Sequence, residues 1–92
     1  MTLHKRYRQN TDVVTRHEGD ETFLFNADTA AFVVINETAR VIWEQCATIT
    51  DIASITAAMA AQYEVDEETA HKDIMEHIGE LTKKSFLVEV TA

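Results

Sequence analysis

The stretch from Ala31 to Trp43, AFVVINETARVIW, constrains the fold most because it changes from a strand pattern to a helix pattern at one residue. Residues 31–35 are rich in β-branched and aromatic side chains, which favour a strand. Asn36 can then accept a hydrogen bond from a free amide of the next turn, and Glu37 suits the positive end of a helix dipole. The sequence therefore predicts a strand that leads directly into a helix at residues 36–46. Its apolar face would contain Ala39, Ile42, Trp43 and Cys46.

Two shorter strand patterns precede this stretch, at residues 11–16 and 21–26. Gly19 and Asp20 supply turn chemistry between them, and residues 26–29 form a second polar turn. Connections this short exclude crossovers, so the three strands should form an antiparallel meander. Phenylalanine and valine alternate with other apolar residues, which makes both faces of the sheet apolar. Either another part of the chain or a partner should therefore cover the second face.

Helical patterns dominate the rest of the chain. A second helix, capped by Thr48 or by Thr50 with Asp51, should run to about residue 62. A third should occupy residues 66–84, and a short strand should follow at 86–90. The order β-β-β-α-α-α-β predicts an α+β domain, and three helices before a strand also fit a winged helix-turn-helix. The predicted core comprises Ile42, Trp43, Ile52, Ile55, Ile74, Ile78 and Leu81.

The chain length of 92 residues indicates one domain, expected at residues 11–90 after a flexible lead-in at 1–10. Neither a signal peptide nor a membrane span is apparent, so we expect a cytoplasmic protein without a membrane partner. The single cysteine, Cys46, excludes an internal disulfide. Its place on an apolar helix face predicts a buried thiol.

The net charge of -8 is unevenly distributed. The first 17 residues carry a net +3, so residues 18–92 carry -11. An acidic body repels polyphosphate, which argues against a nucleic-acid partner. In a winged-helix DNA-binding transcription regulator, the alternative function, the recognition helix would be residues 66–84. That segment holds six acids against three lysines and offers few phosphate contacts.

Catalytic and metal-binding patterns are weak, so we expect neither an enzyme nor a cofactor. His71 and His77 lie about 240° apart around a helix and cannot share a metal ion. Asp73, His77 and Glu80 share a face, but one helix supplies too few ligands for a metal site. A solvated face is expected instead, with Glu80 and Lys84 as an i,i+4 ion pair. The possible nucleophiles, which have no base or glycine-rich turn nearby in the sequence, are Ser54, Ser85 and Cys46.

The third strand has a feature that predicts binding. It ends the meander, so its outer edge should leave backbone amides and carbonyls free for an extended peptide. Residues 32–35 contain no proline, lysine or glutamate to block that edge. Two alternatives remain open: Val88 and its neighbours could cover the edge, or a second copy could cover it in a homodimer.

A family resemblance points the same way. The run FLFNADTAAFVVINETARVIWEQC, followed by DIASITAAMAAQYEVDEETAHKDIMEHIGELTKKSFL, resembles the PqqD family of small peptide chaperones. The similarity covers residues 11–90 and is most specific around INETA and the following Ile42 and Trp43. Two positions depart from the family pattern. Ala47 and Thr48 replace an Asp-Gly turn after the first helix, and Ser85 replaces a glycine before the last strand.

The resemblance implies a RiPP recognition element, with a three-stranded sheet on three helices in a winged-helix arrangement. Such domains bind the leader of a ribosomally made precursor peptide as an added strand beside the third strand and against the third helix. They present it to a tailoring enzyme, which in the PQQ pathway is a radical S-adenosylmethionine enzyme. The expected partners are thus a precursor peptide and a tailoring enzyme, either the radical S-adenosylmethionine enzyme of a PQQ-type pathway or the enzyme of another RiPP pathway.

The predicted peptide site joins the third strand to one margin of the third helix. Phe32 and Val34 should face away from Ile35, and one of Val33 and Val34 should point its N–H outward. On the helix, the margin of the core stripe is assigned to His71 and Met75, whose thioether could adapt to a peptide side chain. The predicted site residues are Ala31, Phe32, Val33, Val34, Ile35, His71 and Met75.

Overall fold

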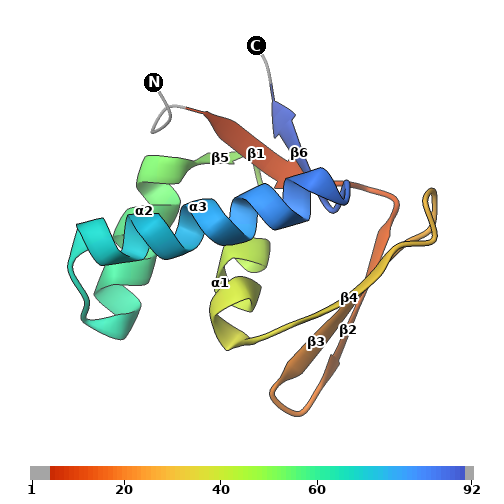
Figure 1. Cartoon of the computed structure of the whole chain (residues 1–92), viewed down its shortest axis with the longest axis horizontal. Coiled ribbons are helices and arrows are strands. Elements are labelled where there is room, and N and C mark those ends of the chain that lie inside the picture. Colours follow the sequence, from red (N-terminus) through yellow and green to blue (C-terminus); the bar gives the residue numbers. More distant parts are fainter. Residues whose placement is uncertain (1–4, 91–92) are drawn as a thin grey trace.

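A computed structural model describes residues 5–90 as three helices and two small antiparallel sheets (Figure 1). The α+β class and the order of the predicted elements are confirmed. In chain order the elements are β1 (Arg6–Gln9), β2 (Val13–Glu18), β3 (Glu21–Asn26), β4 (Phe32–Ile35), α1 (Glu37–Gln45), β5 (Thr50–Asp51), α2 (Ile52–Tyr63), α3 (Glu67–Lys83) and β6 (Leu87–Val90).

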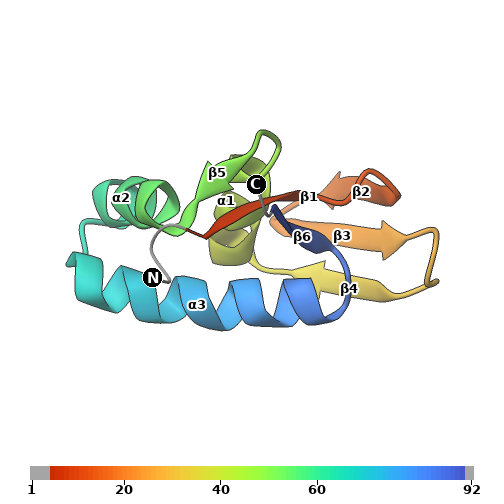
Figure 2. The same cartoon turned by 90° about the horizontal axis from the view of Figure 1, so that it is seen from above.

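The strands form two sheets where the sequence predicted one. The meander β2-β3-β4 is present as expected, and a second sheet has the order β5-β1-β6. Because β6 pairs with β1, it does not cover the outer edge of β4. Helix α3 runs along one side of the molecule, and the sheet β2-β3-β4 lies at the end away from α2 (Figure 2).

Strand β1 corrects the expectation of a flexible lead-in. Arg6–Gln9 pairs with β5 on one side and β6 on the other, and Tyr7 is only 5% exposed. Both partners come from distant parts of the chain, so the local sequence carried no signal for this strand. The predicted lead-in also included Lys5 and Asn10, which flank this strand. Its first four residues, 1–4, lie outside the described residues.

Each helix begins at a polar side chain that accepts a hydrogen bond from the amide three residues later. Asn36 accepts from Ala39 at 2.9 Å, as the sequence predicted for α1. The corresponding caps are Asp51 for α2 and Asp66 for α3, with Oδ1 to amide distances of 2.7 Å in both. The hydrogen bond from the Thr69 amide, and a second from its side chain, hold the pKa of the Asp66 carboxyl below its usual value.

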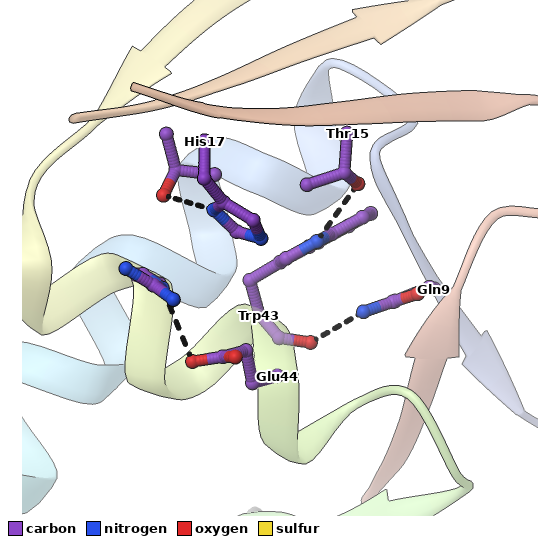
Figure 3. Close-up of polar contacts among 7 residues, drawn as sticks. Gln9, Thr15, His17, Trp43 and Glu44 are labelled. Atoms are coloured by element: carbon purple, nitrogen blue, oxygen red, sulfur yellow. Dashed lines mark hydrogen bonds and ion pairs between the residues drawn. The ribbon is translucent and has the colours of Figure 1, made fainter. Parts of the chain in front are cut away.

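Trp43 connects α1 to both sheets. It is 2% exposed, and all the other predicted core residues are also buried. Its indole Nε1–H donates to Thr15 Oγ1 in β2 at 3.2 Å, and its carbonyl accepts from Gln9 Nε2 in β1 at 2.7 Å (Figure 3). The predicted core is therefore confirmed, with Trp43 at the junction of the two sheets.

Cys46 lies at the same junction. Its side chain is fully buried, and burial raises the pKa of the thiol to about 12. The Gln9 amide donates to the Cys46 carbonyl at 2.9 Å and fixes β1 against the end of α1. The predicted buried thiol is confirmed.

Candidate functional site

The outer edge of β4 is open over the part of the chain that the structure describes. Strand β4 pairs with β3 in the register Leu24↔Val33, and no described strand pairs with its other side. The Asn26 amide donates to the Ala31 carbonyl at 2.8 Å, which makes Asn26 and Ala31 a hydrogen-bonded pair. Hydrogen-bonded pairs alternate along an antiparallel ladder, so Val33 directs its backbone groups toward β3. It follows that Phe32 and Val34 direct their N–H and C=O groups outward.

The side chains of β4 follow the predicted alternation. Phe32 and Val34 are 58% and 43% exposed, whereas Ile35 is 5% exposed. Val33 is half-buried and packs against the core, as does Ala31 just before the strand. The expectation that Phe32 and Val34 face away from Ile35 is therefore confirmed.

A groove lies between β4 and the C-terminal half of α3. It contains a hollow of about 120 Å³. Ala39 and Leu81 supply a buried apolar floor, and polar side chains from α3 form the opposite rim. The lining residues are Val33, Val34, Ile35, Asn36, Ala39, His77, Glu80, Leu81 and Lys84. An added strand beside β4 would lie along this groove.

The groove has charged groups available for a ligand. The predicted Glu80–Lys84 ion pair does not form, since the ion pairs of the described residues are Lys5–Glu89, Arg16–Glu18 and Arg40–Glu44. A second, more open hollow of about 500 Å³ lies beyond the end of β4, where the acids Asp20, Glu21 and Glu37 line it with Val34, Ile35 and Asn36. One end of the site is therefore acidic and the other carries both signs of charge.

His71 and Met75 do not line this groove. Both are half-buried; Met75 packs against the core, and His71 Nε2 is covered without a hydrogen-bond partner. The core stripe of α3 has two margins, and helical periodicity alone does not show which one faces β4. The structure places His77, Glu80 and Lys84 at the margin beside β4. Peptide contact by His71 or Met75 stays a prediction.

Asn26 holds the two walls of the groove in place, a role that the sequence did not predict. Its side chain is fully buried at the end of β3. Oδ1 accepts from the amides of Asp28 at 2.9 Å and Thr29 at 3.2 Å, and Nδ2 donates to the Ser85 carbonyl at 2.9 Å. Asn26 thus ties the turn before β4 to the segment after α3. The sequence marked it as a turn residue, but nothing local indicated its burial.

Ser85 ends α3 in a left-handed conformation, with φ of 63°. The Phe86 amide donates to the Leu81 carbonyl at 2.9 Å, and the Ser85 amide donates to the Thr82 carbonyl at 3.0 Å. These two bonds define a Schellman motif, in which glycine is the preferred residue at the left-handed position. The departure from the family pattern noted at this position is therefore a change at a strained backbone site.

Other kinds of site find little support in the described residues. Within residues 5–90, no group of three or more His, Cys, Asp or Glu side chains could hold a metal ion. No helix in that range is long and apolar enough to span a membrane. The one thiol, Cys46, is buried with a raised pKa and is therefore a poor nucleophile.

Two solved structures share this arrangement of two sheets and three helices. The fold of the chain is similar to a structure described as "TbiB1 in Complex with the TbiA(beta) Leader Peptide", with a TM-score of 0.81 and 24% identity over 92% of this chain and 99% of that one. A second similar structure is "Lasso peptide synthetase B1 complexed with the leader peptide", with a TM-score of 0.77 and 17% identity over 89% and 96% of the two chains.

The family model of PqqD, coenzyme PQQ synthesis protein D, matches residues 21–87, and the chain belongs to this family. The resemblance drawn from the sequence is therefore confirmed. A comparison with curated proteins found no match. The findings give no support to the DNA-binding alternative.

Proposed function

We propose that this chain is a non-catalytic peptide chaperone that binds the leader of a ribosomally synthesised precursor peptide. The leader adds as a strand to the outer edge of β4 and lies in the groove beside α3. The chain then presents the precursor to a modifying enzyme, either a radical S-adenosylmethionine enzyme as in the PQQ pathway or the enzyme of another RiPP pathway.

The open edge of β4 is the observation that carries this proposal. Phe32 and Val34 each direct an N–H and a C=O toward an empty groove whose floor is apolar. Backbone bonds to such an edge provide affinity, and the adjoining pockets provide specificity for alternate side chains. Membership of the PqqD family and the leader peptides held by the two similar structures support the same reading.

The Val34→Pro variant tests strand addition directly. Proline removes the outward N–H at position 34 without removing a bond to β3, so the fold should survive. A backbone hydrogen bond contributes about 0.5–1.5 kcal/mol net, and the proline ring also hinders the approach of the leader strand. Together these effects should lower the affinity for the leader about tenfold. Calorimetric titration with a synthetic leader, taken from a precursor encoded beside the gene for this chain, measures the loss.

Two matched variants complete the experiment. Val34→Ala keeps the N–H and should bind far more tightly than Val34→Pro, which separates the amide from the side chain. Val33→Pro removes a bond to β3 and should lower the melting temperature, as circular dichroism will show. A folded Val34→Pro variant that binds the leader as well as the wild type does would rule out strand addition at this edge.

A further inference from the structure

The outer face of the sheet β2-β3-β4 gathers exposed apolar side chains. Six large hydrophobic residues of residues 5–90 are exposed, and four of them lie on this face: Val14, Phe25, Phe32 and Val34, at 61%, 42%, 58% and 43%. The Phe23 ring stacks on Phe32 with centroids 5.9 Å apart. The strand register aligns Val14, Phe25 and Phe32 in one row across the sheet. Apolar groups concentrated in this way mark an interaction surface more often than scattered ones do.

The rest of the described chain leaves this face open. Thr15 and Leu24 point to the opposite face, where Thr15 meets Trp43 and Leu24 is fully buried. The sequence predicted that either another part of the chain or a partner covers the second face. Within residues 5–90 no segment covers it, which leaves a partner.

Acidic side chains border the apolar row at both ends of the sheet. The β2-β3 turn contributes Glu18, Asp20 and Glu21, and the opposite end contributes Asp12 and Asp28. The only lysine or arginine on these strands is Arg16, whose guanidinium pairs with Glu18 at 2.8 Å. A complementary partner therefore has an apolar centre flanked by lysine or arginine. A second copy of this chain would bring a like-charged border against this one.

The face is continuous with the proposed leader site. Phe32 and Val34 direct their side chains onto the face and their backbone groups to the free edge. A leader strand added at that edge would extend the sheet and place every second side chain in the same surface. A protein docked on the face would therefore contact the sheet and the leader together.

We propose that the outer face of β2-β3-β4 is the docking surface for the modifying enzyme, which binds it through an apolar patch bordered by basic side chains. This proposal rests on the proposed function, because that function identifies the modifying enzyme as the partner that binds this face. It adds that the enzyme recognises the loaded chaperone better than the free one.

The test uses a double variant at positions away from the leader edge, Val14→Thr with Phe25→Thr. Threonine keeps strand propensity while removing the apolar surface. The control is Ile49→Thr with Val65→Thr, since Ile49 and Val65 are similarly exposed at 52% and 42% but lie outside this sheet. The probes are the purified modifying enzyme and the synthetic leader encoded beside the gene for this chain.

We expect the double variant to lose at least tenfold in affinity for the enzyme while its affinity for the leader changes by less than twofold. The control variant should bind both like the wild type, and added leader should tighten enzyme binding to the wild type. If circular dichroism shows that the double variant does not fold, Phe25→Thr alone carries the test, with a loss of about threefold.

Three outcomes would overturn the proposal: unchanged enzyme affinity in the variant, an equal loss in the control, or a wild-type dimer that light scattering shows to dissociate in the variant. The last would make the face an interface between copies. Failure of the leader to bind the wild type would instead refute the proposed function. Enzyme binding measured without the leader would still test whether this face is the docking surface.

Discussion

The two sheets each have three antiparallel strands but differ in the surfaces that they present. In β5-β1-β6, arginines lie opposite valines, with the pairs Arg6↔Val90 and Arg8↔Val88, and all four side chains are half-buried. In β2-β3-β4, Phe25 lies opposite Phe32, and both are exposed. Arginine stems cover neighbouring apolar groups while their charged ends stay in water. The apolar groups of the first sheet are therefore partly covered, whereas those of the second are exposed.

The edges do not by themselves distinguish the sheets. Over the described residues, β5 and β6 each have one neighbour in the first sheet, and β2 and β4 each have one neighbour in the second. An unpaired edge and an uncovered apolar face are both costly in a small protein unless a partner uses them. Finding an open edge beside an uncovered apolar face on β2-β3-β4 supports the proposal that this sheet is the binding half of the molecule.

Removing Trp43 should have the largest effect, because this side chain holds both sheets. Trp43→Ala should lower the free energy of unfolding by about 3–5 kcal/mol through the cavity and the lost indole bond to Thr15. Urea denaturation followed by circular dichroism measures the loss. An unchanged midpoint would show that the sheets do not depend on a shared anchor.

Asn26→Ala should have the next largest effect and should act mainly on the binding sheet. It removes three hydrogen bonds made by a buried side chain, to the amides of Asp28 and Thr29 and to the Ser85 carbonyl, at about 0.5–1.5 kcal/mol net for each. We expect the free energy of unfolding to fall by about 2–4 kcal/mol. The Ser85 carbonyl keeps one donor, which limits the loss.

Asn10→Ala is the matched control. Asn10 Nδ2 also donates to the Ser85 carbonyl at 2.9 Å, but from an exposed position. Asn10 Oδ1 also accepts from the Asp12 amide at 3.0 Å, and water can replace both exposed bonds, so the loss should stay at about 0.5–1 kcal/mol. Equal losses in the two variants would show that burial of Asn26 contributes nothing to the position of the groove walls.

Ser85→Gly should have the smallest effect, with the opposite sign. The left-handed backbone costs a residue with a side chain about 1–2 kcal/mol, and glycine gives back about 0.5–1 kcal/mol through its freer unfolded chain. We expect a gain of up to about 1 kcal/mol, seen as a higher melting temperature. A lower one would mean that the serine side chain stabilises the end of α3.

The sequence predicted the elements whose signals are local. Asn36 and Asp66 were identified as helix starts, and residues 21–26 were identified as a strand with its observed bounds. Strand β1 was missed because its partners, β5 and β6, lie far along the chain. Pairing of that kind depends on the fold as a whole, which a short window of sequence does not contain.

The binding edge was predictable and the opposite wall was not. Alternation along residues 31–35 placed Phe32 and Val34 outside, and the structure agrees. On α3, the apolar stripe predicted Ile74 and Leu81 in the core but left both margins equivalent, so the choice between Met75 and His77 needed the position of β4. Periodicity gives the buried face of a helix, whereas its neighbours decide the function of each margin.

The buried thiol of Cys46 provides a probe of how often the protein opens locally. A thiol with a pKa of about 12 holds almost no thiolate at neutral pH, and the closed structure shields it from reagents. Chemical labelling therefore proceeds through transient openings of the junction where Gln9 meets the end of α1. The labelling rate reports how often this junction opens, at a place remote from the β4 edge. The lifetime of the closed state can thus be followed in the natural sequence, with and without a bound peptide.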